Sequence, residues 1–185
     1  MADNTAEAAS DEADADAEAP DAPPEPETRY GMPVTHSRGQ VVLHPSREQL
    51  EQLVRDLRDD EGFLVCVDLT AVDHLSYSAT RDLPEGIEAE RFEVVVGLLS
   101  HARRERLRLR VQVPASDPTC PSLFDVHPGV EALEREVYDM FGISFEGHPD
   151  LTRILMPEDW EGFPLRKDSP VGAIPVQFKG VQNAR

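Results

Sequence analysis

The pattern of apolar residues first indicates a helix that begins after Pro45. Ser46 is a favourable N-cap residue, and Gln49 three positions later completes the pattern of a capping box. Apolar side chains then recur at helical spacing, and they are Leu50, Leu53, Val54 and Leu57. Charged residues fill the intervening positions, and Gly62 ends the pattern. The sequence therefore predicts one amphipathic helix with a single buried side.

Three β-strands are predicted in the middle of the chain. Residues 63–72 form a nearly continuous apolar run rich in β-branched side chains, which is typical of a central strand covered on both faces. Residues 91–100 and 106–114 predict two more strands, and the short polar link between them predicts an antiparallel hairpin. In the last strand apolar and polar residues alternate, so we expect one solvated, basic face. Its polar residues are Arg106, Arg108, Arg110 and Gln112.

A second helix is predicted from Pro128 to Phe141, with Gly142 at the position of a C-terminal cap. Beyond Gly142 the chain is rich in glycine, proline and charge, so we expect little regular structure there. These elements predict an α+β fold. Two main helices pack on a small, mainly antiparallel sheet, and a long irregular C-terminal segment follows.

Composition divides the chain into four parts. Residues 1–29 are predicted to be a disordered acidic tail, because ten of the 36 acidic side chains lie in the first 27 residues and no lysine or arginine accompanies them. Residues 30–141 are predicted to form the globular α+β domain. Residues 142–170 are predicted to be an irregular interface segment, and residues 171–185 an extended C-terminal arm.

The net charge of -18 argues against nucleic acid or an anionic membrane surface as the main partner, because both attract basic proteins. No apolar stretch reaches the roughly 18 residues of a membrane-spanning helix, and the start of the chain lacks the basic and apolar regions of a secretory signal. Cys66 and Cys120 stand alone, so they predict neither an iron–sulfur cluster nor a structural zinc site. We expect a soluble, cytoplasmic chain with no cofactor of its own.

Few side chains on the second helix suggest catalysis. Glu134 and Arg135 are expected on its solvent side, and Glu136 is expected to be partly buried beside its apolar stripe, next to Met140. Glu134 and Glu136 point in nearly opposite directions, so they cannot flank one substrate as a catalytic pair. Arg135 and Asp139 have the spacing of an ion pair along the helix.

His148 and Asp150 could act as a base with its orienting acid, or could recruit a metal ion. Pro149 between them restricts their geometry, and no third ligand stands at a usual spacing. A local hydrogen bond of the histidine is therefore the favoured interpretation. A free-standing hydrolase that uses His148 and a carboxylate is the weaker alternative, since the chain has no Gly-x-Ser-x-Gly motif.

The segment 142–170 combines few helix or strand formers with side chains that often anchor protein interfaces. These side chains are Phe145, Arg153, Trp160, Phe163, Arg166 and Lys167. We therefore expect a partner protein to order this segment and the arm 171–185.

Several blocks of residues resemble one protein family. They are Asp68 to Asp73, Glu134 to Ile143, Gly147 to Leu151, Arg153 to Leu155, Asp159 to Gly162 and Pro164 to Asp168. The blocks resemble the 30-kDa subunit of respiratory complex I, which in bacteria is the C-type subunit of the NADH–quinone oxidoreductase. The resemblance extends over residues 45–170. The resemblance implies that the chain is the unfused form of the family, in which the domain is expected not to continue into the D-type subunit that holds the quinone site.

The resemblance implies an α+β fold and a subunit that binds no cofactor itself. FMN and the iron–sulfur clusters would lie in partner subunits, and the whole complex would pass electrons from NADH to a quinone, coupled to proton translocation. The chain would sit in the peripheral arm on the cytoplasmic side of the cell membrane. Its partners would be the quinone-site (D-type) subunit and the neighbouring cluster-bearing subunits, so that quinone and membrane are reached only through the complex.

The resemblance implies no catalytic, cofactor-binding or metal-binding residue in this chain. Ion pairs within the domain or across to the quinone-site subunit would be made by Glu134, Arg135, Glu136 and Asp139. Tyr138, Phe141 and Gly142 belong to the same motif. The long segment would be fixed against neighbouring subunits by His148, Asp150, Arg153, Trp160, Arg166, Lys167 and Asp168. The same type of domain also occurs in energy-converting, membrane-bound hydrogenases. A subunit of such a hydrogenase is therefore the alternative function.

Overall fold

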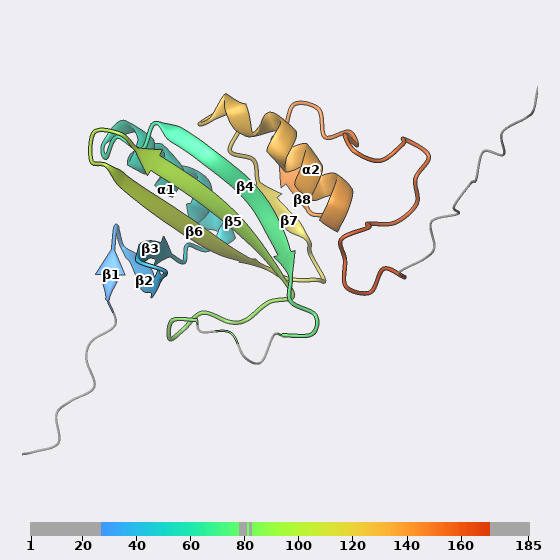
Figure 1. Ribbon diagram of the computed structural model, residues 1–185, viewed down its shortest axis with the longest axis horizontal. Coiled ribbons are helices and arrows are strands. Elements are labelled where there is room, and N and C mark those ends of the chain that lie inside the picture. Colours follow the sequence, from blue (N-terminus) through green and yellow to red (C-terminus); the bar gives the residue numbers. More distant parts are fainter. Residues whose placement is uncertain (1–26, 78–80, 82, 171–185) are drawn as a thin grey trace, which may run out of the picture.

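A six-stranded sheet forms the frame of the computed structural model, which describes residues 27–77, 81 and 83–170 (Figure 1). Its strands are β1 (Thr28–Arg29), β2 (Met32–Ser37), β3 (Gln40–Leu43), β4 (Val65–Asp73), β5 (Phe92–Ser100) and β6 (Glu105–Val113). They lie in the order β1-β2-β3-β6-β5-β4. All neighbours are antiparallel except β3 and β6, which are parallel. The mainly antiparallel sheet is therefore confirmed.

Two helices and a small second sheet complete the fold. The helices are α1 (Arg47–Asp59) and α2 (Glu131–Phe141), and a 3₁₀ turn at Pro128–Val130 leads into α2. The second sheet pairs β7 (Thr119–Pro121) with β8 (Ser144–Glu146) in parallel. Apolar side chains of both helices and both sheets belong to one core cluster. The α+β class with two main helices is thus confirmed.

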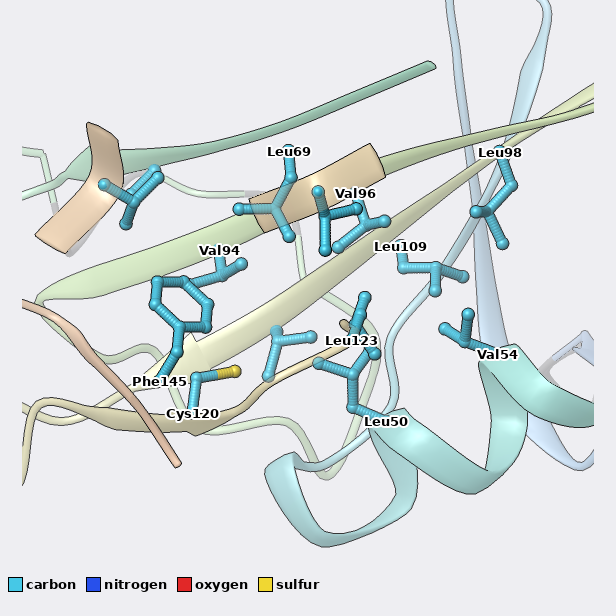
Figure 2. Packing of buried hydrophobic residues seen from close by; sticks show 14 of the residues in the cluster. Leu50, Val54, Leu69, Val94, Val96, Leu98, Leu109, Cys120, Leu123 and Phe145 are labelled. Carbon is cyan, nitrogen blue, oxygen red and sulfur yellow. The ribbon is translucent and has the colours of Figure 1, made fainter. Parts of the chain in front are cut away.

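Helix α1 forms as its sequence predicts. The backbone N–H of Ser46 donates to the Gln49 side chain at 3.0 Å, which satisfies one of the free groups at the helix start. The four apolar residues of its stripe are all buried, and Figure 2 shows Leu50 and Val54 directed toward side chains of the sheet. The helix ends at Asp59, shortly before Gly62, which has a φ of 74°.

Strands β5 and β6 occupy the middle of the core, as the predicted hairpin requires. The core-facing residues of β6 are Leu107, Leu109, Val111 and Val113, and each is at most 2% exposed. They pair across the hairpin with core residues of β5 such as Val96 and Leu98 (Figure 2). Each fully buried side chain of this kind contributes about 1.5–3 kcal/mol relative to an exposed one.

The prediction of a central strand at residues 63–72 was wrong, because β4 is the edge of the sheet. Helix α2 packs against β4, but Val67 on this strand is 48% exposed. A change of pairing register between Cys66 and Asp68 also marks β4 as irregular. Continuous β-branched sequence indicates strand structure wherever the strand lies, so it did not reveal which faces are covered.

Two hairpin turns near the start of the domain were missed. Tyr30-Gly31 joins β1 to β2, and Arg38-Gly39 joins β2 to β3. All four residues have positive φ angles between 52° and 74°, which is the backbone conformation that tight two-residue hairpins need. Pairing begins at Thr28, two residues inside the predicted tail. The rest of that tail and the predicted arm 171–185 lie outside the described residues.

Within the part of the chain that the structure describes, no helix is both long and apolar enough to cross a membrane.

We predict that Leu109→Ala lowers the free energy of unfolding by about 2–5 kcal/mol, because it removes buried methyl groups and leaves a cavity in the centre of the core. The control is Leu64→Ala, since Leu64 is 69% exposed. It should change the free energy of unfolding by less than about 0.5 kcal/mol. Urea denaturation followed by circular dichroism measures both, and equal effects would contradict the described burial.

Candidate functional site: the anchored C-terminal segment

Residues 142–170 cross the outer side of α2 as an irregular segment, drawn in orange to red in Figure 1. The sequence predicted that a partner would be needed to order it. The structure instead attaches it to its own domain at three anchors, which are the carboxylate of Asp139, the backbone around Gly142 and the carboxylate of Asp73. The segment also contains one short strand, because Ser144–Glu146 forms β8.

Asp139, on helix α2, is fully buried and forms the first anchor. Its Oδ2 atom accepts hydrogen bonds from the backbone N–H groups of Ile154, Leu155 and Met156 at 3.1, 2.8 and 2.8 Å. Its Oδ1 atom accepts one from the guanidinium of Arg153 at 2.6 Å. Burial alone would raise the pKa of Asp139, but these donors outweigh it and hold the pKa below its ordinary value.

The predicted ion pair between Arg135 and Asp139 is therefore not formed. Arg135 instead pairs with Glu131, one turn earlier, at 3.2 Å and donates to the carbonyl oxygen of Thr152 at 3.1 Å. The spacing of the two residues permitted a contact along the helix. It could not reveal that Asp139 faces inward, toward a loop that follows in the sequence, where Arg153 and three backbone groups compete for it.

Gly142 provides the second anchor, and it caps α2 with a φ of 71° as predicted. A Cβ atom at this position would lie 2.5 Å from the side chains of both Arg166 and Phe163, so only glycine fits. Arg166 donates to the carbonyl oxygens of Phe141 at 2.5 Å and of Gly142 at 3.3 Å. Its guanidinium also lies over the rings of Phe163 and Phe92, at 4.4 and 5.1 Å from their centroids.

Asp73, at the end of β4, is buried and forms the third anchor. It accepts the backbone N–H of Lys167 at 2.9 Å and that of Leu75 at 3.0 Å. Arg91 binds it with two nitrogens at 3.1 and 2.9 Å and also pairs with Asp168 at 2.8 Å. Burial would raise the pKa of Asp73, but Arg91 and the two backbone donors outweigh it and lower the pKa.

Glu134 and Glu136 do not lie where the sequence predicted. Glu134 is fully buried rather than on the solvent side, and it accepts from Ser122 Oγ at 2.6 Å and from the N–H of Leu123 at 2.7 Å. Burial raises the pKa of Glu134. Glu136 is exposed and not partly buried beside Met140 as expected. Helical spacing alone could not identify a second buried side, which exists because the strand–turn region around Ser122 packs there.

His148 and Asp150 make local contacts. The Nε2 atom of His148 lies 3.1 Å from the carbonyl oxygen of Glu131, and the backbone N–H of Asp150 donates to Nδ1 at 3.1 Å. The histidine is thus held by the backbone, as the favoured interpretation predicted. No group of three His, Cys, Asp or Glu side chains suited to a metal ion occurs among the described residues.

The other predicted residues differ in their exposure. Tyr138 and Trp160 are half-buried and Phe141 is buried. The side chain of Lys167 is exposed, so its anchor contact is made by its backbone.

Both cysteines are poor nucleophiles and metal ligands, because burial raises the pKa of Cys66 to about 11 and that of Cys120 to about 12.

Comparison with known proteins identifies the family. The family model described as "Respiratory-chain NADH dehydrogenase, 30 Kd subunit" matches residues 43–174, which is most of the chain. The chain belongs to this family. All three anchors of the C-terminal segment lie inside the matched region, together with every residue singled out on α2 and after it.

Relatives of the 30-kDa subunit family are named as the C-type subunit of NADH-quinone oxidoreductase. The one from Saccharopolyspora erythraea is 42% identical over 153 residues, which cover 82% of this chain and 57% of the relative. The one from Acidothermus cellulolyticus is 46% identical over 145 residues, covering 77% of this chain and 70% of the relative. This chain thus spans little more than half the length of the first of these relatives.

Two solved structures resemble the chain. The trypsin-resistant fragment of Nqo5 is 35% identical with a TM-score of 0.56, and the match covers 65% of this chain and 90% of the fragment. A chain of the membrane-bound sulfane sulfur reductase, an archaeal respiratory membrane complex, has a TM-score of 0.61 and covers 83% of this chain and 90% of its own length. Its identity is 20%, so it shows the fold alone.

A buried polar cluster on the other face of the sheet escaped prediction in this member of the 30-kDa subunit family. Glu93 is 2% exposed. It accepts from Arg110 at 2.7 and 3.0 Å, from Gln112 at 2.7 Å and from Arg81 at 3.3 Å. Burial would raise the pKa of Glu93, but Arg110 and Gln112 outweigh it and lower the pKa. The predicted basic face is therefore neutralised at its Arg110 end.

Exposed apolar side chains mark the surface of the anchored segment. Leu155 is 61% exposed and follows the loop that Asp139 holds, and Leu165 is 50% exposed beside the contacts of Arg166. Leu75 is also exposed, and its backbone shares Asp73 with that of Lys167. Backbone hydrogen bonds thus fix the positions of side chains that have little to contact within the described chain.

We predict that Asp139→Asn loosens residues 150–168 and costs roughly 1–3 kcal/mol of stability, because Arg153 loses its buried charged partner. The single tryptophan of the chain, Trp160, lies in this segment and reports its loosening by fluorescence. Glu136→Gln removes the same charge from an exposed position of the same helix and should leave both stability and fluorescence unchanged. Equal effects of the two changes would contradict the anchor.

We also predict a dependence on acid pH. The pKa values of Asp139 and Asp73 are lowered in the folded chain, so their stabilisation is present above the ordinary carboxylate pKa of about 3.9 and is lost as pH falls through the lower folded values. Glu134 acts in the opposite direction, because its pKa is raised and its protonated form is favoured by folding. Below about pH 4, the fluorescence of Trp160 should change before the circular dichroism of the sheet does. A single coincident transition would contradict this prediction.

Proposed function

We propose that this chain is a non-catalytic peripheral-arm subunit of an NADH–quinone oxidoreductase. In that complex it would scaffold the quinone-site subunit. Electrons would pass from NADH through FMN and iron–sulfur clusters in partner subunits to a quinone, coupled to proton translocation. Membership of the 30-kDa subunit family over residues 43–174 is the observation that carries the proposal.

A structural rather than chemical role is supported by the side chains themselves. The buried carboxylates of Asp139, Asp73 and Glu134 are each occupied by hydrogen bonds within the chain. Such groups hold a fold in place and are not free to exchange protons with a substrate. As part of the proposal, the flavin and the clusters lie in partner subunits.

The surface of the anchored segment is the proposed contact with the quinone-site subunit. Leu155 and Leu165 are exposed apolar side chains on a backbone that Asp139 and Arg166 hold in place. Preformed apolar side chains of this kind bind a partner with little loss of conformational freedom. Membrane association and a position on the cytoplasmic side would follow from the partners.

The proposal is tested first by affinity purification of the chain from its native membranes. An assembly that oxidises NADH with a quinone as acceptor is expected. Recovery with a nickel–iron subunit, and without an NADH-oxidising one, would instead assign the chain to a membrane-bound hydrogenase. A chain recovered without partners in mild detergent would overturn the assignment to either complex.

The contact surface is tested separately by Leu155→Asp combined with Leu165→Asp. Charged residues at a desolvated interface should lower the yield of the co-purified complex roughly tenfold or more. The isolated chain should unfold as before, since both side chains are exposed. Leu64→Asp is the control. Leu64 is 69% exposed and precedes the first residue of β4, whereas the anchor Asp73 is the last residue of that strand. An equal loss with the control would contradict this placement.

A further inference from the structure

Four arginines at one end of the sheet form a basic patch, which comprises Arg38, Arg104, Arg106 and Arg108. No ion pair of these four is present within the described residues. Their neighbours differ, since Arg103 pairs with Glu61 and Arg110 pairs with the buried Glu93. The basic patch is thus a local excess of positive charge on a chain whose net charge is -18.

The basic patch borders a shallow hollow of about 350 Å³ on the face of the sheet that lies opposite the helices. Figure 1 views the sheet with α1 behind it. Gly97 forms part of the hollow, and Arg106 and Arg108 line it opposite a single carboxylate, that of Asp68. A glycine in the middle of a strand leaves room for another chain to approach the sheet closely. With two arginines against one carboxylate, the lining of the hollow has an excess of positive charge.

The sequence before the domain contains a segment with the matching pattern. Residues 11–18 read Asp-Glu-Ala-Asp-Ala-Asp-Ala-Glu, so from Glu12 to Glu18 acidic residues alternate with alanine. In an extended conformation, alternate side chains point to the same side, about 6.8 Å apart. Arg106 and Arg108 are also alternate residues of an extended strand and share a face. Their spacing therefore equals that of successive carboxylates in this segment.

The chain enters the fold in the right direction. The carbonyl oxygen of Glu27 accepts the N–H of Val34 at 3.0 Å, and the Glu27 carboxylate lies 3.6 Å from His36. Since β1 and β2 are antiparallel, residues that precede Glu27 run toward the turn that contains Arg38. That turn lies at the same end of the sheet as the start of β6, because Val41 is aligned with Leu107.

The distance is short enough for this contact. Glu27 follows Glu18 by nine positions, and nine residue steps span at most about 30 Å when the chain is extended. Three strand spacings separate β1 from β6 in the sheet, which amounts to about 14 Å. The acidic segment can therefore reach the basic patch with chain to spare.

We propose that residues 11–18 of this chain dock on its own basic patch in an extended conformation, with alternate carboxylates facing Arg106 and Arg108. The contact is electrostatic and intramolecular, so it weakens with salt and needs no high affinity. The free chain thereby covers its own basic surface, and an acidic partner must displace the tail to use it. The tail contact does not depend on the proposed function.

The test places a spin label on the tail of the full chain through Ser10→Cys. Cys66 is changed to serine, and Cys120 is left because its burial keeps it unreactive. The backbone amide signals of Arg106, Arg108 and Gly97 should lose about half of their intensity or more at roughly 50 mM NaCl and regain it at about 0.5 M, where charges are screened within a few ångströms. Amides on the outer side of α1 should stay unaffected.

A pair of variants with equal charge changes decides the outcome. Arg106→Gln combined with Arg108→Gln should abolish the loss of signal, whereas Arg55→Gln combined with Lys167→Gln should preserve it. Arg55 and Lys167 lie on other elements, outside the basic patch. Absent or uniform broadening, or broadening that survives the Arg106 and Arg108 changes, would overturn the proposal. So would a basic patch that stays open in the free chain and is covered only by an acidic segment of a partner.

Discussion

One buried carboxylate fixes the loop at residues 153–156, from which the last part of the described chain continues. Asp139 is buried between helix α2 and the loop that follows, where an unpaired charge would be costly. Three consecutive backbone N–H groups and the guanidinium of Arg153 satisfy it. Because these donors belong to residues 153–156, the loop must adopt one conformation around the carboxylate. The chain continues from this loop to Lys167, whose backbone N–H binds Asp73.

The anchors explain how a segment without helices and with few strand residues can present a defined surface. Asp139 and Asp73 bind backbone N–H groups of the segment, and the carbonyl oxygens of Phe141 and Gly142 accept hydrogen bonds from the Arg166 side chain. These polar contacts act together with apolar residues of the segment, such as Phe145, that belong to the core. Leu155 and Leu165 remain exposed on this surface. In a family whose members are named as subunits of a larger enzyme, a rigid irregular surface of this kind suits recognition by shape.

Local patterns in the sequence predicted the elements that depend on neighbours in the chain. Helix α1, the β5–β6 hairpin and the cap at Gly142 all follow from spacings of a few residues. Contacts between distant residues could not be predicted in this way. Glu134 accepts a hydrogen bond from Ser122, twelve residues earlier. Asp73 accepts one from the backbone of Lys167, more than half of the chain away in sequence. The edge position of β4 is also a property of the whole sheet and not of its own residues.

The parallel pairing of β3 with β6 has a consequence for the order of folding. Strands β4, β5 and β6 follow one another in the chain and pair as antiparallel neighbours, so their contacts close short loops. Strand β3 must wait for β6, which lies more than 60 residues later, and its pairing closes a long loop at greater entropic cost. During synthesis the N-terminal hairpin therefore emerges first and joins the sheet late. Until β6 leaves the ribosome, the strand edge of β3 has no partner in its own chain.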